Sequence, residues 1–206
     1  MADKDDRPGL ILASGSRARR QMLQAAGLAF TVVPADIDER AIRGALLGGN
    51  AVIDPGGVAE ALARAKAEAV SRDHPKALVI GADQVLALGS QLFDKPADAD
   101  GARDCLLKLR GRTHQLHSAV ALAQGGAVIW VHTKAAHLTM RNFSELSLAE
   151  YLARAGAALC ESVGAYQIEG PGIQLFERVE GDYFTILGLP LLPLLEELRS
   201  RKVLVQ

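Results

Sequence analysis

The sequence predicts an α/β protein built on a mixed β-sheet. Short apolar runs alternate with helix-period segments, and the unbroken apolar run at 77–80 is typical of a buried central strand. Two long strand-like runs meet at a Gly-Gly turn, which adds an antiparallel hairpin to the sheet. No internal repeat, low-complexity tract or linker interrupts the 206 residues.

Each element is bounded by a local signal. Asp54 and Pro55 are an N-cap and first-turn pair, Gly81 closes the central run, and Gly89-Ser90 is a hairpin turn. The expected elements are strand 10–14, a helix ending at Gly27, strand 30–33, acidic loop 35–40, helix 54–72, strands 77–80, 85–88 and 91–93, helix 98–109, strands 113–123 and 127–140, helix 146–155, a glycine-punctuated segment 164–188 and helix 191–201.

Composition limits the functional classes. A 49% hydrophobic content can fill a sizeable core, in one large domain or in a main domain with a smaller lobe. The net charge of −1 implies no bulk attraction to nucleic acid or to an anionic membrane, so any anion site is local. Two cysteines are too few for a disulfide framework. Residues 1–9 are expected to be a flexible N-terminus without the apolar core of a signal peptide, which favours the cytoplasm.

The first candidate site follows the first predicted strand. Ser14, Gly15 and Ser16 form a small polar turn, and Arg19 lies in the first turn of the next helix. Backbone N–H groups at a helix start, hydroxyls and a guanidinium can together bind a phosphate. The ending of a Walker A loop is absent. A solvated helix start with exposed arginines explains the same pattern, so both interpretations stay open.

The second candidate is Asp83. Its carboxylate is expected just beyond the carboxyl end of the central strand, where open α/β sheets usually bind ligands. The alternative is an aspartate that caps a turn by bonding its own backbone.

Weaker signals come from three other places. Pro96 restricts Lys95 to an extended conformation, although a lone lysine is normally a solvated surface charge. The acidic side chains within 36–39 could bind a hard divalent cation or could merely solvate a loop. Lys66 is expected on a solvated face of its helix.

In this order the motifs resemble those of the Maf family of nucleoside triphosphate pyrophosphatases. The resemblance runs from about Leu10 to Leu198; no single motif is specific, but seven in order are. The seven are Ser14-Gly15-Ser16 with Arg19, Gly81-Ala82-Asp83, Lys95-Pro96, Gly111-Arg112-Thr113-His114, Gly164-Ala165-Tyr166, Glu180-Gly181-Asp182-Tyr183 and Gly188-Leu189-Pro190.

The resemblance implies a single domain over 10–206 with two lobes, a cleft between them and a fold related to the inosine triphosphate pyrophosphatases. It also implies hydrolysis of a nucleoside triphosphate to a monophosphate and pyrophosphate with a divalent metal, Mg²⁺ or Mn²⁺, and a homodimer. Neither nucleic acid nor membrane is an expected partner.

The resemblance also implies roles for single residues. Catalytic positions fall on Asp83, Lys66 and Lys95, and the metal positions on Glu39 and Asp83. Substrate-binding positions fall on Ser14, Ser16, Arg19, Ala18, Gln84 and Glu169. Fixed cations would stabilise the charge on the leaving pyrophosphate, and a carboxylate would activate water directly or through the metal. Which of the two carboxylates takes which part stays open.

Departures from the family pattern bear on the preferred base. Arg17 stands where members usually have proline, and Ala18 where they have arginine. The dTTP/UTP branch tends to carry arginine, threonine and glutamine at the positions of Ala18, Gln84 and Glu169, and the 7-methyl-GTP branch tyrosine, glutamine and glutamate. Two of three positions thus match the 7-methyl-GTP branch.

Two features qualify that preference. A buried Glu169 would pair with a cationic methylated guanine, but Ala18 lacks an aromatic ring to stack on it. The motifs 164–166 and 181–183 look more like the dTTP/UTP branch. We therefore expect a pyrophosphatase of modified or noncanonical nucleotides that leans toward 7-methyl-GTP.

The alternative is a nucleotide-binding regulator of septum formation with little turnover. A nucleic-acid-binding domain is disfavoured by the near-zero charge.

Overall fold

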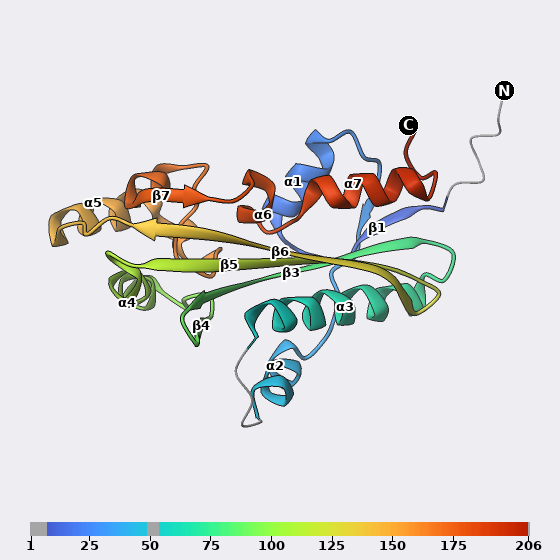
Figure 1. Cartoon of the computed structure of the whole chain (residues 1–206), viewed down its shortest axis with the longest axis horizontal. Helices are drawn as coiled ribbons and strands as arrows, with labels where there is room; N and C mark the ends of the chain where they lie inside the picture. The colour runs from blue at the N-terminus through green and yellow to red at the C-terminus, as the bar shows by residue number, and fades with distance from the viewer. Residues whose placement is uncertain (1–7, 49–53, 206) are drawn as a thin grey trace. The chain divides into compact units, whose positions relative to one another are not determined.

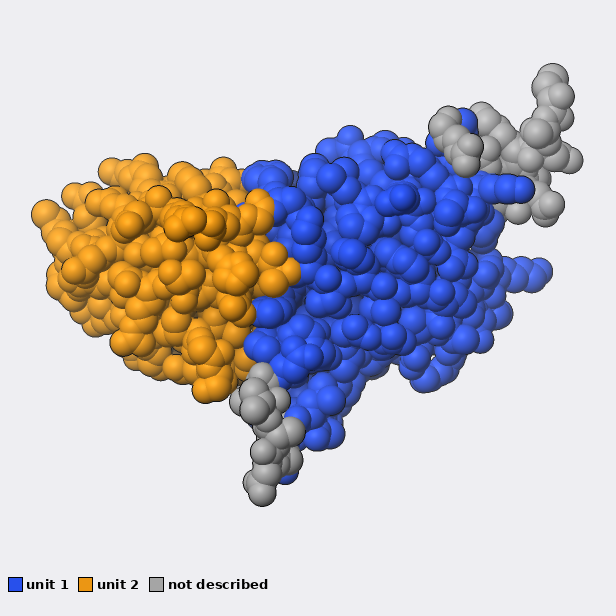
Figure 2. All heavy atoms as spheres, in the orientation of Figure 1, with its two compact units in different colours: residues 1–84, 117–134, 182–206 blue, residues 85–116, 135–181 orange. Residues whose placement is uncertain are grey.

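The computed structural model describes residues 8–48 and 54–205. Most of the segment 1–9, which was predicted to be flexible, lies outside these residues. The chain divides into two compact units (Figure 2): unit 1 comprises residues 1–84, 117–134 and 182–206, and unit 2 comprises 85–116 and 135–181. In the described ranges, no helix is both long and apolar enough to cross a bilayer.

Helices and strands alternate as the sequence predicts (Figure 1). Among the described residues, seven strands form one mixed sheet in the order β2-β1-β3-β5-β6-β7, with β4 paired to β3. The elements are β1 (Leu10–Leu12), α1 (Arg17–Ala25), β2 (Thr31–Val32), α2 (Glu39–Leu47), α3 (Pro55–Asp73), β3 (Leu78–Leu88), β4 (Gln91–Phe93), α4 (Ala99–Leu109), β5 (Thr113–Gln124), β6 (Ala127–Met140), α5 (Glu145–Ala155), two 3₁₀ turns (Gly156–Cys160 and Pro171–Leu175), β7 (Phe176–Glu180), α6 (Tyr183–Ile186) and α7 (Leu191–Ser200).

The core of unit 1 has two layers because strand residues alternate between the faces of the sheet. Leu12 of β1 packs in one cluster with Leu23 of α1 and Leu194 of α7. Its neighbour Ile11 joins the opposite cluster with Val70 of α3. Figure 1 shows α1 and α7 on one side of this part of the sheet and α3 on the other.

The central strand is longer than predicted, and its glycine has a different role. β3 continues through Gly81 to Leu88, so the prediction that the strand ends at Gly81 is wrong, and Asp83 lies inside the strand. A Cβ atom on Gly81 would lie 2.2 Å from the carbonyl oxygen of Ala63 in α3. The glycine therefore allows the backbone of α3 to approach the strand closely. A glycine that only ended the strand would not need to make room for a helix.

Other boundaries agree with their local signals. Asp54 caps α3 by accepting a hydrogen bond from the Gly56 N–H at 3.0 Å. The predicted hairpin is confirmed, since Leu88 of β3 pairs with Gln91 of β4 in antiparallel register. The turn between β5 and β6 contains Gly125 and Gly126, both with positive φ.

Some elements are missing from the sequence prediction. The expected acidic loop 35–40 runs into α2, because Asp38 acts as the N-cap and accepts a hydrogen bond from the Ala41 N–H at 2.9 Å. The segment 164–188 contains β7 and α6. β7 and α6 are both short, so their sequences show little of the apolar periodicity by which strands and helices are recognised.

Unit 2 contains a buried aromatic cluster around His114. The His114 ring is fully buried, and its Nε2 lies 2.7 Å from the hydroxyl of Tyr166. The Tyr166 ring meets the Phe176 ring edge-on, with centroids 4.8 Å apart. Burial lowers the pKa of His114 to about 4, so the ring is neutral in the folded protein at neutral pH.

We predict that Gly81→Ala destabilises the protein strongly, because the added methyl group meets helix backbone. Overpacking of this kind typically costs about 1–3 kcal/mol. Urea unfolding measures the change. Gly44→Ala is the matched control, since Gly44 lies in α2 with nothing within 4 Å of its Cβ position. The control should be neutral or mildly stabilising; equal effects of the two substitutions would contradict the close packing at Gly81.

We also predict a pH dependence of stability from His114. Its pKa in the fold, about 4, lies below the ordinary 6.5, so the folded state binds fewer protons. The contribution of His114 is therefore complete above pH 6.5 and disappears as the pH falls toward 4, by up to about 3 kcal/mol. His114→Gln should flatten the stability profile in this window, whereas His137→Gln, at an exposed position, should not. Parallel profiles for wild type and His114→Gln would refute this origin.

Candidate active site

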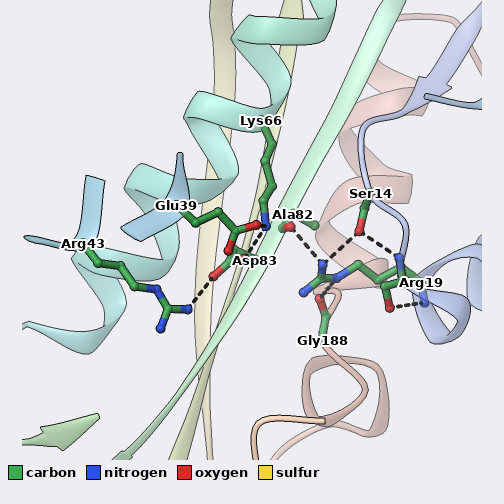
Figure 3. A network of polar contacts seen from close by, with 9 residues as sticks. Ser14, Arg19, Glu39, Arg43, Lys66, Ala82, Asp83 and Gly188 are labelled. Atoms are coloured by element: carbon green, nitrogen blue, oxygen red, sulfur yellow. Dashed lines mark hydrogen bonds and ion pairs between the residues drawn. The ribbon is translucent and has the colours of Figure 1, made fainter. Parts of the chain in front are cut away.

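A buried ion pair joins α3 to β3 in unit 1 (Figure 3). Lys66 Nζ donates to Asp83 Oδ1 at 2.6 Å, and the two residues are 8% and 5% exposed. The prediction of a solvated Lys66 is therefore wrong. The close approach of α3 at Gly81 accounts for the burial, since Lys66 follows Ala63 by one helical turn. Two buried charges are tolerated only when they are paired closely.

Glu39, the first residue of α2, is the second carboxylate of this group. Its Oε1 lies 2.9 Å from Lys66 Nζ, so one ammonium bridges Glu39 and Asp83. Partial burial by itself raises the pKa of Glu39, but the hydrogen bond from Lys66 and the positive charges of Lys66 and Arg43 outweigh it and lower the pKa overall. Glu39 is therefore ionised at neutral pH.

Arg43 is a further charged neighbour, and sequence reasoning missed it. Its Nη2 lies 4.0 Å from Asp83 Oδ2, and its side chain is 18% exposed. Glu39 and Arg43 are four residues apart, so they share one face of α2. That spacing could have revealed Arg43 only if 39–47 had been predicted as a helix. Asp83 Oδ2 itself is buried and accepts no hydrogen bond from the described residues.

Arg19 is buried and joins three segments of unit 1. Its Nε donates to the Gly188 carbonyl at 2.8 Å, and its Nη1 donates to Ser14 Oγ and to the Ala82 carbonyl, both at 3.0 Å. Burial lowers the pKa of the Arg19 guanidinium, and the negative charge of Asp83 partly offsets this shift. The predicted phosphate ligand is thus held in place by protein acceptors through two of its three nitrogens.

The other predicted residues near the start of α1 have different surroundings. Ser16 is the N-cap of α1, and its Oγ accepts a hydrogen bond from the Arg19 N–H at 3.4 Å. Ala18 is partly buried in the first turn, and Arg17 and Arg20 are exposed. The substrate-binding roles of Ser16 and Ala18 stay predictions.

Gln84 is tied to α6 through its amide. Its Nε2 lies 3.0 Å from Ser118 Oγ, 3.2 Å from the Thr185 carbonyl and 3.0 Å from the Ile186 carbonyl. Ser118 is fully buried and donates to the same Thr185 carbonyl at 2.7 Å. Asp182 caps α6 by accepting from the Thr185 N–H at 2.9 Å. These contacts direct the amide nitrogen of Gln84 toward the carboxyl end of α6.

Strand β3 separates the polar residues into two groups. Asp83 lies on the face that meets α3, and Gln84 on the face that meets α6, as the alternation of strand side chains requires. Figure 3 shows Lys66, Glu39 and Arg43 on one side of β3, and Arg19 and Ser14 on the other. The structure therefore brings Lys66, Glu39 and Asp83 into contact and holds Arg19 in a neighbouring network.

Two predicted residues belong to unit 2. Lys95 lies just after β4 and is exposed. Glu169 precedes the second 3₁₀ turn and is also exposed, so the expectation of a buried Glu169 is wrong. The contributions of Lys95 and Glu169 to the site in unit 1 stay predictions.

The carboxylates can be tested as a site for a divalent cation. Asp83 Oδ2 is a buried oxygen without a hydrogen bond, and Glu39 supplies an ionised carboxylate that shares Lys66 with Asp83. No group of three or more His, Cys, Asp or Glu that could hold a metal occurs in the described ranges. Magnesium is often bound by one or two carboxylates, with water and substrate phosphates as its other ligands. The pair fits a cation of that kind; Asp38, which caps α2, and the exposed Asp36 are not needed.

A solved structure shows only a distant likeness. The Ham1 protein of Staphylococcus aureus is 15% identical, with a TM-score of 0.43 over 65% of this chain and 72% of that one. The predicted relation to the inosine triphosphate pyrophosphatases therefore stays a prediction.

Sequence relatives are much closer. A protein of Mesorhizobium japonicum named 7-methyl-GTP pyrophosphatase is 56% identical over 93% of this chain and 95% of its own length. A protein of Brucella suis biovar 1 with the same name is 53% identical, over 94% and 96%. A protein of Paramagnetospirillum magneticum named nucleoside triphosphate pyrophosphatase is 56% identical, over 95% and 100%.

The family model described as Maf-like protein matches residues 9–201. This match includes β1, the charged residues of α1, α2 and α3, and the last helix. The site described above thus lies within the matched range, and the chain belongs to the Maf family.

Proposed function

We propose that this protein hydrolyses nucleoside triphosphates between the α and β phosphates, releasing a nucleoside monophosphate and pyrophosphate. The observation that carries the proposal is the buried Lys66–Asp83 pair, whose Oδ2 accepts no hydrogen bond from the described residues. Relatives that are 52–56% identical over most of the chain are named as pyrophosphatases of this kind.

In this reaction Asp83 Oδ2 accepts the proton of the attacking water. The hydrogen bond from Lys66 to Oδ1 orients the carboxylate and leaves the second oxygen available for the proton. Proton transfer to a positioned carboxylate typically contributes a factor of about 10²–10⁴ to the rate. Lys66 also places a fixed positive charge beside the phosphates, where negative charge shifts onto the leaving pyrophosphate.

Arg19 and Ser14 supply the anion-binding part of the site. The bonds from Arg19 Nε and Nη1 to protein acceptors leave Nη2 as the nitrogen for a phosphate oxygen. A side chain held in this way loses little conformational freedom when the phosphate binds. Lys95 is proposed as a further phosphate ligand.

In the alternative division of roles, Asp83 would join Glu39 in holding a divalent metal, Mg²⁺ or Mn²⁺, in place of accepting the proton itself. When bound, the metal lowers the pKa of a coordinated water and neutralises phosphate charge. The ionised state of Glu39 at neutral pH suits this role, since metal ligands must be deprotonated.

The proposed substrates are modified or noncanonical nucleotides, with a preference for 7-methyl-GTP. Gln84 and Glu169 support this preference, since the resemblance associates both residue types with that branch. The exposed carboxylate of Glu169 is available to a cationic or N–H-rich base edge.

We predict that Asp83→Asn lowers kcat by about 10²–10⁴-fold, because the amide cannot accept the proton. Pyrophosphate release with Mg²⁺ measures turnover. Asp36→Asn is the control: Asp36 is an exposed carboxylate of the same charge, and we expect unchanged turnover. Wild-type turnover in Asp83→Asn would remove Asp83 from the mechanism. Tight nucleotide binding by the wild type without cleavage would favour a nucleotide-binding regulator instead.

We predict that 7-methyl-GTP has the highest kcat/KM in a panel with GTP, CTP, UTP and dTTP. In Glu169→Gln the preference should move toward UTP or dTTP by about tenfold, because the amide replaces a charge-assisted hydrogen bond with a neutral one. Glu161→Gln, another exposed carboxylate of unit 2, is the matched control. An unchanged profile in Glu169→Gln would show that this residue does not read the base.

A further inference from the structure

One loop of unit 2 carries Glu169, the residue for which we propose contact with the base. Glu169 is exposed and lies in a tight turn, which the Gly170 N–H closes by donating to the Gln167 carbonyl at 3.3 Å. Tyr166 directly precedes this turn and is 5% exposed. The position of Glu169 therefore depends on how Tyr166 is held.

Tyr166 is held through both its side chain and its backbone. Its hydroxyl lies 2.7 Å from Nε2 of His114, which is fully buried in β5. Its N–H donates to Ser162 Oγ at 3.1 Å, and the same Oγ donates to the Tyr166 carbonyl at 2.7 Å. The two bonds to Ser162 close the loop on itself, whereas the bond to His114 ties the loop to the sheet.

Ala165, just before Tyr166, has a backbone conformation that residues with a side chain seldom adopt. Its φ is 58°, in the left-handed region, and the residue is fully buried. The hydroxyl of Tyr151 in α5 donates to the Ala165 carbonyl at 2.9 Å. A strained residue of this kind persists only where its surroundings hold it, and such residues cluster at active sites and ligand clamps. The loop is thus constrained where it enters the turn of Glu169.

Packing alone does not explain a histidine at position 114. Its Nδ1 is buried and has no hydrogen-bond partner in the part of the chain that the structure describes. An apolar side chain could pack against the rings of Tyr166 and Phe176 without burying an unpaired polar atom. The feature that requires a polar ring here is the bond between Nε2 and the Tyr166 hydroxyl.

We propose that His114 and Tyr166 are positioning residues for base recognition, because their hydrogen bond fixes the turn that presents Glu169 to the base of the nucleotide. The inference rests on the proposed function, since both residues act through Glu169. Neither residue contacts the nucleotide itself. A turn that is fixed before binding loses little conformational freedom when the base binds, which increases the affinity.

The test measures binding, so it does not depend on turnover. Calorimetry gives Kd for 7-methyl-GMP and for UMP with the wild type, Tyr166→Phe, Glu169→Gln and the double variant. Because Tyr166→Phe removes one hydroxyl and keeps the ring, we expect it to raise Kd for 7-methyl-GMP by about tenfold and to leave Kd for UMP within about threefold. In the Glu169→Gln background the same substitution should have no further effect, since residues that act as a unit are not additive.

Leu138→Val is the control for a loss of stability alone. Leu138 is fully buried in β6 of unit 2, and the substitution removes one methylene from the core. Thermal melting measures how far each variant is destabilised, and Leu138→Val should keep the wild-type ratio of the two Kd values. If Tyr166→Phe does not fold, Tyr166→Phe combined with His114→Leu replaces both partners of the hydrogen bond by apolar groups.

Three results would overturn the proposal. The first is an unchanged Kd for 7-methyl-GMP in folded Tyr166→Phe. The second is an equal rise of Kd for both nucleotides, which a merely structural role would produce. The third is an additive effect in the Glu169→Gln background, which would show that Tyr166 does not act through Glu169. Failure of the proposed function is distinguishable: the wild type would then cleave no nucleoside triphosphate, while the Kd values of the monophosphates would still report on Tyr166.

Discussion

The close packing of α3 on β3 at Gly81 determines where the charged residues of unit 1 lie. Because no side chain separates the two backbones at this point, Lys66 reaches Asp83 at 2.6 Å within a buried environment. Removing one partner of such a pair leaves an uncompensated charge and typically costs about 3–5 kcal/mol. The pair therefore constrains the fold, while Asp83 Oδ2, which accepts no hydrogen bond from the described residues, is left for the proton transfer that we propose.

The second constraint is the short length of β1. Its parallel pairing with β3 ends at Leu12 and Ile80, and the Ala13 N–H still donates to the Ile80 carbonyl. The chain then turns away, and the next carbonyl of β3 on that edge, at Ala82, accepts from Arg19 instead. A backbone group that a longer strand would have satisfied is thus paired by a side chain, as buried carbonyls require.

Much of the fold was predictable because local signals and tertiary structure agree. Asp54 with Pro55 starts α3, and Gly89-Ser90 turns a hairpin, each by a mechanism confined to a few residues. Gly81 was misinterpreted because a glycine at a strand end and one under a packed helix look alike in sequence. The burial of Lys66 follows from that contact, so it was not predictable either. The resemblance to the family supplied the residues of the site, but Arg43 lies outside its motifs.

Helical periodicity explains why one arginine near the start of α1 differs from its neighbours. Arg19 lies three and four residues before Met22 and Leu23, which face the core, so it shares their side of the helix. Arg17 and Arg20 are rotated away from that side and are exposed. A buried guanidinium needs acceptors, and the loop before α1, β3 and the turn after α6 each provide one. The arginine that we propose as the phosphate ligand is therefore the one whose position in the helix faces the core.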